Sequence, residues 1–307
     1  MEFGFVLPRT TKGQDLCDFA RNVEDLGFGS VWAPDHIVIP LDETSQYPYT
    51  HDGKFTVSPN DPQLDVMVVL SYIASSTDRL KIGTSVIIIP YRNPILQAKM
   101  FSTLDVLSEG RVICGVGVGW FEKEFEALNA PYSERGSATD EYLEILKALW
   151  SCSSPGYEGT HYRFNDIGFE PKPIRGSIPI WVGGHTRRAI RRTVKYGDAW
   201  HPTRQTPEYV SKMMDYMKEY CAETGRSPDD ITISLKRTLH FTDMGIDLSD
   251  RIQSDAALIS ETSKVISDIQ KCADLGINQL TFDFQATNVS DCIKVMEHFA
   301  DQVVPQV

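Results

Sequence analysis

The feature that most constrains the fold is a repeated alternation of short apolar runs with segments of helical periodicity. Apolar runs recur at 3–8, 30–33, 80–89, 111–116, 178–182, 198–201, 231–236 and 279–283. Each is followed by a segment whose apolar residues stand three or four positions apart, as a helix face requires. These segments are 16–26, 62–76, 94–107, 137–150, 185–195, 210–221, 265–272 and 289–299. Continuous apolar strands alternating with helices are typical of a parallel sheet that is buried on both faces.

Eight strand–helix units in 307 residues predict an α/β fold, a (β/α)8 TIM barrel that spans residues 1–307 as a single domain. A doubly wound open sheet is the alternative, but no G-x-G-x-x-G pattern follows the first strand. Long insertions follow the second, fourth and seventh strands, at 37–61, 119–136 and 239–260. They lie at the carboxyl ends of the strands, where barrels place their active sites. A further insertion, 151–177, contains a predicted β-hairpin at 157–171.

Charge and composition exclude several classes of protein. The chain has 42 acidic and 30 basic residues, and its net charge of −12 is opposite to that of a nucleic-acid-binding protein or of a protein attracted to anionic membranes. No apolar run approaches the ~18–20 residues of a membrane span. The N-terminus lacks a basic region and a cleavage site, so we expect no signal peptide and a cytoplasmic location. The six cysteines form no C-x-x-C pair, which predicts reduced thiols and no metal site.

Polar and small residues follow the second and fourth predicted strands. Asp35 and His36 stand directly after the second strand. A carboxylate beside an imidazole can hold a polar ring and shuttle a proton, although a loop pair that caps the backbone is an equal alternative. The fourth strand runs into Gly-Val-Gly-Val-Gly-Trp at 115–120, where glycines permit close approach of a flat ring and Trp120 would form an aromatic wall. We expect the next acidic residues to form a solvated helix face: Glu122, Glu124 and Glu126.

The fifth predicted strand ends in the best candidate for a phosphate site. It runs into Gly183 and Gly184, and a helix that carries several arginines follows. Backbone N–H groups at a helix N-terminus bind anions, and glycines let a phosphate come close. Arg187, nearest the helix start, is expected to touch the anion. Thr203, after the sixth strand, adds a hydroxyl to the same site.

Taken together, these motifs resemble the luciferase-like superfamily of flavin and deazaflavin oxidoreductases, and within it the branch that uses coenzyme F420. The resemblance covers about residues 1–205 and is carried by SVWAPDH at 30–36, GTSVIIIPYRNP at 83–94, GVGVGWFEKEF at 115–125, WVGGH at 181–185 and GDAWHP at 197–202. It implies a flavin-type ring at the carboxyl ends of the strands, backed by a non-prolyl cis peptide at Ser85–Val86. It implies that cofactor contacts come from Asp35, Ser85, Val86, Gly117, Val182, Gly183, Gly184, His185 and Thr203.

The same resemblance implies that His36 transfers a proton, with Asp35 and Trp120 beside the reacting groups. Relatives that oxidise a sugar phosphate carry a Glu where Trp120 stands here, so their substrate does not carry over. With coenzyme F420 the chain would transfer a hydride to or from a small organic substrate. With FMN it would be a two-component monooxygenase that uses reduced flavin and O2. A flavin-binding barrel without turnover is a third alternative. The resemblance further implies a homodimer and allows a separate flavin or F420 reductase as a partner.

Overall fold

A closed barrel of parallel strands forms the centre of the computed structural model, which describes residues 1–41, 47–48, 53, 55, 57–247, 256–284, 286 and 288–307. Each barrel strand pairs in parallel with the next, and the last pairs with the first. The predicted (β/α)8 barrel is therefore confirmed. Its strands are β1 (Glu2–Val6), β2 (Ser30–Ala33), β3 (Lys81–Thr84), β5 (Val112–Gly117), β8 (Ile180–Gly183), β9 (Ala199–His201), β10 (Thr232–Phe241) and β12 (Gln279–Phe284).

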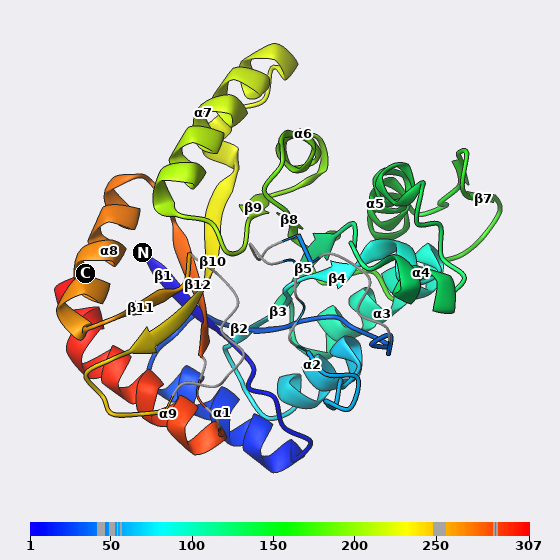
Figure 1. Ribbon diagram of the computed structural model, residues 1–307. Helices are drawn as coiled ribbons and strands as arrows, with labels where there is room; N and C mark the ends of the chain where they lie inside the picture. The colour runs from blue at the N-terminus through cyan, green and yellow to red at the C-terminus, as the bar shows by residue number, and fades with distance from the viewer. Residues whose placement is uncertain are drawn as a thin grey trace.

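Helices surround the barrel, and the last of the α-helices lies beside the first, so that the outer layer closes along with the sheet (Figure 1). Several begin at a side chain that accepts a hydrogen bond from a backbone N–H of the first turn, as Asp65 does for α2 and Asn93 for α3. The helices are α1 (Gly13–Asp25), α2 (Val66–Ala74), α3 (Pro94–Leu107), α4 (Glu122–Ala127), α5 (Arg135–Ser151), α6 (Arg187–Tyr196), α7 (Pro207–Thr224), α8 (Thr262–Asp274) and α9 (Val289–His298), with short turns η1 (Ile89–Tyr91), η2 (Pro228–Asp230), η3 (Phe299–Val303) and η4 (Val304–Gln306).

Three predicted elements differ from the structure. The run 80–89 is divided, because β3 ends at Thr84 and a second short strand, β4 (Ile87–Ile88), pairs with β5. The peptide bond between the two strands, Ser85–Val86, is cis, as the resemblance implied. The seventh strand is longer than predicted, and its end pairs with β11 (Leu258–Ser260) inside the insertion at 239–260. The predicted hairpin is confirmed but shorter, with strands β6 (Tyr157–Glu158) and β7 (Arg163–Phe164).

An aromatic layer inside the barrel supports its carboxyl end. The Trp32 ring stacks on His201 at 5.0 Å between centroids and lies 4.9 Å from Trp181. The Trp32 indole N–H donates to the Ser30 hydroxyl, so its one polar atom is satisfied inside the barrel. All three rings are buried. This layer is a rigid floor for the residues that follow the strands.

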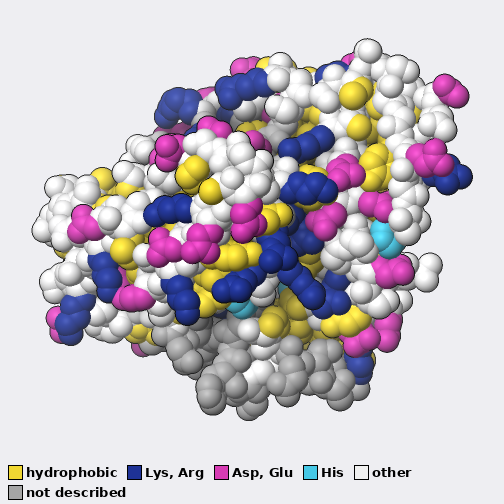
Figure 2. All heavy atoms as spheres, turned by 90° about the horizontal axis from the view of Figure 1, so that it is seen from above, with side chains coloured by type: hydrophobic (Ala, Val, Ile, Leu, Met, Phe, Trp, Pro, Cys, Tyr) yellow, Lys and Arg dark blue, Asp and Glu magenta, His cyan; other side chains and the backbone are white. Residues whose placement is uncertain are grey.

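The outer surface carries both signs of charge. Figure 2 shows acidic and basic side chains interspersed over the face seen from above, with basic and hydrophobic side chains side by side near its centre. Within the described ranges, none of the helices combines the length and the apolar character that crossing a membrane requires.

Candidate active site

A cavity of about 580 Å³ opens at the carboxyl ends of the barrel strands. This volume lies within the range of about 300–1,000 Å³ that is usual for small-molecule and cofactor sites. Its wall includes most of the predicted site residues: Asp35, His36, Ser85, Val86, Gly117, Trp120, Gly183, Gly184 and Thr203. Val182 is buried in the barrel wall, and neither it nor His185 is among the residues that line the cavity. The cavity wall therefore gives no support to the predicted cofactor contacts of Val182 and His185, which stay predictions.

Asp35 is held in an ion pair. Its two carboxylate oxygens accept hydrogen bonds from the Arg92 guanidinium at 2.7 and 2.8 Å, and one of them also accepts from the Ile88 backbone N–H at 2.9 Å. Arg92 reaches Asp65 as well, at 3.3 Å. The Asp35 side chain thus joins the end of β2 to β4 and to the start of α3. Its predicted part in proton transfer remains untested.

His36 is paired with a carboxylate that the sequence analysis misplaced. Its Nδ1 lies 2.9 Å from Oε2 of Glu124, whose side chain is fully buried. The same carboxylate accepts hydrogen bonds from the Tyr91 hydroxyl at 3.0 Å and from the backbone N–H groups of Ile37 and Val38 at 2.7 and 3.2 Å. The prediction of a solvated Glu124 is wrong.

Helix geometry explains that error. Glu122 and Glu126 are exposed, as predicted, and they lie four residues apart on one face of α4. Glu124 is only two residues from each of them, so it points to the opposite face and into the protein. The acidic run therefore contains one buried functional candidate between two surface residues.

Electrostatics keep the Glu124 carboxylate ionised. Burial alone would raise the pKa of Glu124, but the hydrogen bond and charge of His36 and the Ile37 N–H outweigh burial and lower that pKa. Burial and the neighbouring carboxylate raise the pKa of Tyr91 well above its usual value, so the phenol remains a donor. Because an ionised carboxylate only accepts, Nδ1 of His36 must carry a hydrogen. The pair therefore fixes the orientation of the ring and leaves Nε2 of His36 to other partners, as in carboxylate–histidine pairs generally.

Val86 forms part of the cavity wall, and glycines make room for it. A Cβ at Gly117 would lie 2.6 Å from Cγ2 of Val86, and one at Gly183 would lie 2.9 Å from Cγ1. Real Cβ atoms essentially never approach other atoms so closely. The glycines at these two positions thus serve the packing of Val86 against β5 and β8, beyond the predicted role of admitting a flat ring.

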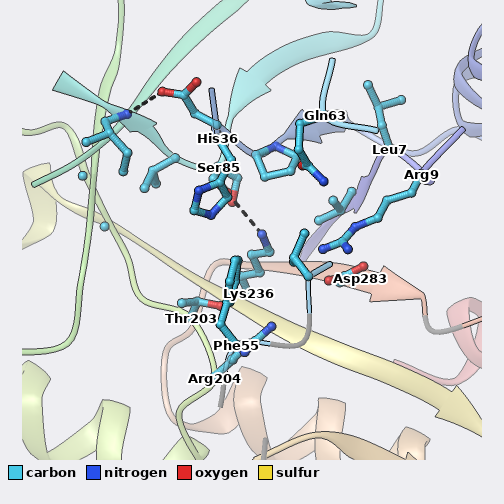
Figure 3. Close-up of a pocket in the computed structure, with 18 of the residues that line it drawn as sticks. Leu7, Arg9, His36, Phe55, Gln63, Ser85, Thr203, Arg204, Lys236 and Asp283 are labelled. Atoms are coloured by element: carbon cyan, nitrogen blue, oxygen red, sulfur yellow. Dashed lines mark hydrogen bonds between the residues drawn. The ribbon is translucent and has the colours of Figure 1, made fainter. Parts of the chain in front are cut away.

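Ser85 is fixed by residues on neighbouring strands. Its hydroxyl lies 3.0 Å from Nε2 of His201, and Nδ1 of that ring lies 2.8 Å from the Ser234 hydroxyl. Burial, with a contribution from the Lys236 charge, lowers the pKa of His201 to about 3, so His201 is neutral and structural. The Ser85 carbonyl accepts a hydrogen bond from Nζ of Lys236 at 3.2 Å (Figure 3).

The candidate phosphate end combines Gly183 and Gly184 with Thr203 on the cavity wall. Gly184 has φ +97°, a backbone conformation that favours glycine. Its carbonyl accepts a hydrogen bond from the Trp200 indole at 2.8 Å, which fixes the turn. Arg187, predicted to touch the anion, is exposed and lies over the Tyr216 ring at 4.7 Å, outside the cavity wall.

A cluster of aromatic side chains lines the cavity near His36. The Trp120 ring lies 4.9 Å from Tyr47 and 5.1 Å from Phe55, and it stacks on Phe121 at 4.5 Å. The Phe55 ring is also 5.1 Å from His36. The structure therefore places Trp120 in an aromatic wall, as the sequence predicts.

Four charged residues of the cavity wall were missed by the sequence analysis. They come from four neighbouring strands: Arg204 and Arg9 follow β9 and β1, and Lys236 and Asp283 lie within β10 and β12. A signal was present for one of them, because Lys236 ends the otherwise uncharged run 231–236.

Residues 1–275 match the family model described as luciferase-like monooxygenase. The chain belongs to this family. An uncharacterized protein of Mycobacterium tuberculosis is 29% identical over 273 residues, which cover 85% of this chain and 96% of the relative. An F420-dependent glucose-6-phosphate dehydrogenase of Microbacterium testaceum is 30% identical over 245 residues, covering 75% and 66%. An FMNH2-dependent dimethylsulfone monooxygenase of Pseudomonas putida is 28% identical over 171 residues, covering 54% and 47%.

Solved structures share the same fold. The monooxygenase RslO1 from Streptomyces bottropensis superposes with a TM-score of 0.78 at 19% identity and covers 99% of both chains. An F420-dependent secondary alcohol dehydrogenase in complex with an F420–acetone adduct also gives a TM-score of 0.78, at 18% identity, covering 100% of this chain and 98% of the other. Luciferase-like relatives thus include both F420-dependent and FMN-dependent proteins, and membership alone leaves both cofactors open.

Proposed function

We propose that this luciferase-like protein is an oxidoreductase that transfers a hydride between coenzyme F420 and a small organic substrate. The observation that carries the proposal is the His36–Glu124 pair on the wall of the cavity. Hydride transfer between an alcohol and a carbonyl compound requires a proton to leave or reach the substrate oxygen at the same centre. A histidine whose other ring nitrogen is bound by a buried carboxylate is suited to that exchange.

The cavity fits a flavin-type ring with a phosphate-bearing side chain. Val86 presents its side chain beside glycines that have no room for a Cβ, which leaves an apolar wall against which a flat ring can pack. Gly183, Gly184 and the Thr203 hydroxyl would hold the phosphate at one end. The Ser85 hydroxyl and carbonyl are fixed by His201 and Lys236, so the wall behind the ring is rigid.

When bound, F420 supplies or accepts a hydride at a ring carbon. In the oxidative direction, Nε2 of His36 takes the proton of the substrate hydroxyl as the hydride leaves the adjacent carbon, and an alcohol becomes a carbonyl compound. In the reductive direction, the same nitrogen returns the proton to the oxygen. Glu124 holds the imidazole in place and stabilises its positive charge, and Tyr91 donates to Glu124.

F420 is favoured over FMN by the motifs of the first 205 residues and by the broader match to the F420-dependent relative. That relative aligns with 75% of this chain, whereas the FMNH2-dependent relative aligns with 54%. A two-component FMN monooxygenase is the second candidate, because the same cavity would admit a reduced flavin.

Turnover without oxygen tests the proposal. The protein is incubated anaerobically with F420, oxidised or reduced, and a panel of small alcohols or carbonyl compounds, and the deazaflavin absorbance is followed. We expect substrate-dependent loss or recovery of the F420 signal with no need for O2. Product formation only with reduced FMN and O2, accompanied by oxygen uptake, would instead establish the monooxygenase. No turnover with either system would leave a binding protein as the remaining reading and contradict the proposal.

A further inference from the structure

The cavity has two chemically different sides. One side, the cationic wall, consists of Arg9, Arg204 and Lys236 together with Asp283. The other, the aromatic wall, consists of Tyr47, Phe55 and Trp120. Figure 3 shows Arg9 and Lys236 reaching into the same cavity as His36. In the hydride and proton transfer proposed above, Lys236 only holds the Ser85 carbonyl, and the other charged groups of the cationic wall have no part.

We propose that the cationic wall binds a carboxylate of the substrate while the aromatic wall packs against its apolar or aromatic body. The substrate class is then a small organic acid whose alcohol or carbonyl group reacts at His36. This inference rests on the proposed function for the reaction, but the binding of the acid does not depend on it.

The charge of the cationic wall points to an anion. The chain as a whole carries a net charge of −12, yet among the described residues of this wall three cations stand against one carboxylate. Asp35, the second acidic residue that the described part of the chain contributes to the lining, is already bound by Arg92. Positive charges on a partly enclosed surface attract and hold small anions more strongly than the same charges in open water.

Lys236 is the centre of this wall. Its Nζ donates a hydrogen bond to the Ser85 carbonyl at 3.2 Å. Because this acceptor is neutral, the contact does not neutralise the positive charge of the lysine. The pKa of Lys236 is lowered to about 8, mainly by burial. The negative charge of Asp283 raises this pKa, whereas the positive charges of Arg204 and Arg9 lower it further. The cations are thus close enough to repel one another. A bound anion would relieve that repulsion.

A carboxylate suits the site better than a phosphate. Asp283 lies within the wall and would repel a dianion more strongly than a monoanion. Arginine guanidinium groups bind carboxylates and phosphates alike through two parallel hydrogen bonds, so the preference for a carboxylate comes from Asp283. The turn at Gly183 and Gly184 is the part of the cavity that suits a phosphate.

The aromatic wall defines the other half of the substrate. The Arg204 guanidinium lies 5.1 Å from the Tyr47 ring, so the cationic and aromatic walls meet there. Phe55 lies 5.1 Å from both Trp120 and His36. An apolar body that contacts Phe55 would therefore lie near the proposed proton-transfer residue.

The test compares acids with their neutral amides. Benzoate, phenylacetate and 3-phenylpropionate are titrated calorimetrically against the cofactor-free protein and against the F420-loaded protein, each beside its amide. We expect the best acid to bind about tenfold or more tightly than its amide, because charge-assisted hydrogen bonds are lost in the amide. Lys236→Met and Arg9→Met should each remove most of this preference. Lys212→Met, which removes an exposed lysine on α7 outside the cavity, should leave it unchanged.

The pH dependence of the wild type gives a readout that needs no variant. Lys236 faces Asp283, Arg204, Arg9 and the neutral His201, and of these the lysine is the group that loses charge near pH 8. The preference for the acid should fall as the pH rises above about 8 and should persist in part because the arginines stay charged.

Three results would overturn the inference. Equal binding of acid and amide, or no measurable binding of either at millimolar concentration, would show that the wall does not bind carboxylates. Unchanged preference in both variants would place the acid elsewhere. Loss of F420 affinity in Lys236→Met with an unchanged preference would assign the wall to the acidic tail of the coenzyme. Because the acid titrations are also made without cofactor, a failed F420 titration would not affect them.

Discussion

The two sides of the cavity treat buried charge in opposite ways. Beside β2 and β5, each carboxylate has its partners in the chain: Asp35 is held by Arg92, and Glu124 by His36, Tyr91 and two backbone N–H groups. Beside β9, β10, β12 and β1, cations lie together and the pKa of Lys236 falls to about 8. The first side is thus organised by contacts within the chain, as proton transfer requires, whereas the second gathers positive charge at the place where we propose that an anion binds.

Removing the imidazole gives the largest expected effect on the organised side. His36→Ala should lower turnover by ~100- to 10,000-fold, the usual worth of a general acid or base, with little change in cofactor affinity. Steady-state kinetics and a fluorescence titration of the cofactor measure the two quantities. His161→Ala, which changes a histidine paired with Glu134 outside the cavity wall, is the matched control. A large loss of cofactor affinity with normal turnover of the bound form would assign His36 to binding instead.

Changing the buried carboxylate comes next. Glu124→Gln places an amide N–H₂ among hydrogen-bond donors, so it should cost ~2 kcal/mol of unfolding free energy and lower kcat more than it raises KM. Glu126→Gln, on the exposed face of the same helix, should change neither. Urea unfolding and steady-state kinetics provide both readouts.

The pH dependence of that loss has a defined sign. The pKa of Glu124 is lower in the folded protein than its usual value of 4.5. Ionised Glu124 therefore stabilises the fold fully at pH values above 4.5. This stabilisation is lost as the pH falls through the lowered folded value. The difference between wild type and Glu124→Gln should therefore be largest near neutral pH and shrink below about pH 4.5. A difference that grows on acidification would mean that Glu124 is protonated in the native state.

The close packing of Gly117 against Val86 predicts an effect that a second substitution partly reverses. Gly117→Ala should push Val86 toward the cavity, weaken cofactor binding and cost ~1–3 kcal/mol of stability, as overpacking does. The double variant Gly117→Ala with Val86→Ala removes the clashing methyl groups and should recover part of both losses. Thermal unfolding and cofactor titration of the set form a double-mutant cycle. Additive losses would show that Gly117 does not act through Val86.

The smallest effect is expected at the proposed phosphate end. Thr203→Val keeps the shape of the side chain and removes one hydroxyl, so cofactor affinity should fall by ~2- to 10-fold, the worth of one hydrogen bond. Thr224→Val, near the end of α7, serves as the control. Unchanged affinity would move the phosphate away from Thr203.

The barrel was predictable because its strands and helices differ in local period, and eight such alternations leave few folds. The break between β3 and β4 was not predicted, because the β-branched character of the run 80–89 indicates one strand, although small and polar residues at 83–85 stand where it divides. The ring-side cis peptide at Ser85–Val86 came from the resemblance and is present.

Within the site, positions set by local helix geometry were predictable, whereas pairings between distant residues were not. The inward position of Glu124 could have been predicted from its spacing between Glu122 and Glu126 on a helix. The pairing of Asp35 with Arg92 could not, because the two residues are 57 positions apart and no local pattern joins them. Sequence patterns report which face a residue takes, whereas the choice of a distant charge partner emerges only from the closed barrel.

A parallel fluorescence titration of the cofactor-free protein with coenzyme F420 and with FMN decides which cofactor this cavity binds. We expect low-micromolar or tighter binding of F420 and clearly weaker binding of FMN, which would place the His36–Glu124 pair beside a hydride carrier. Tight binding of FMN with weak or absent binding of F420 would contradict the account and make this cavity the site of a flavin monooxygenase.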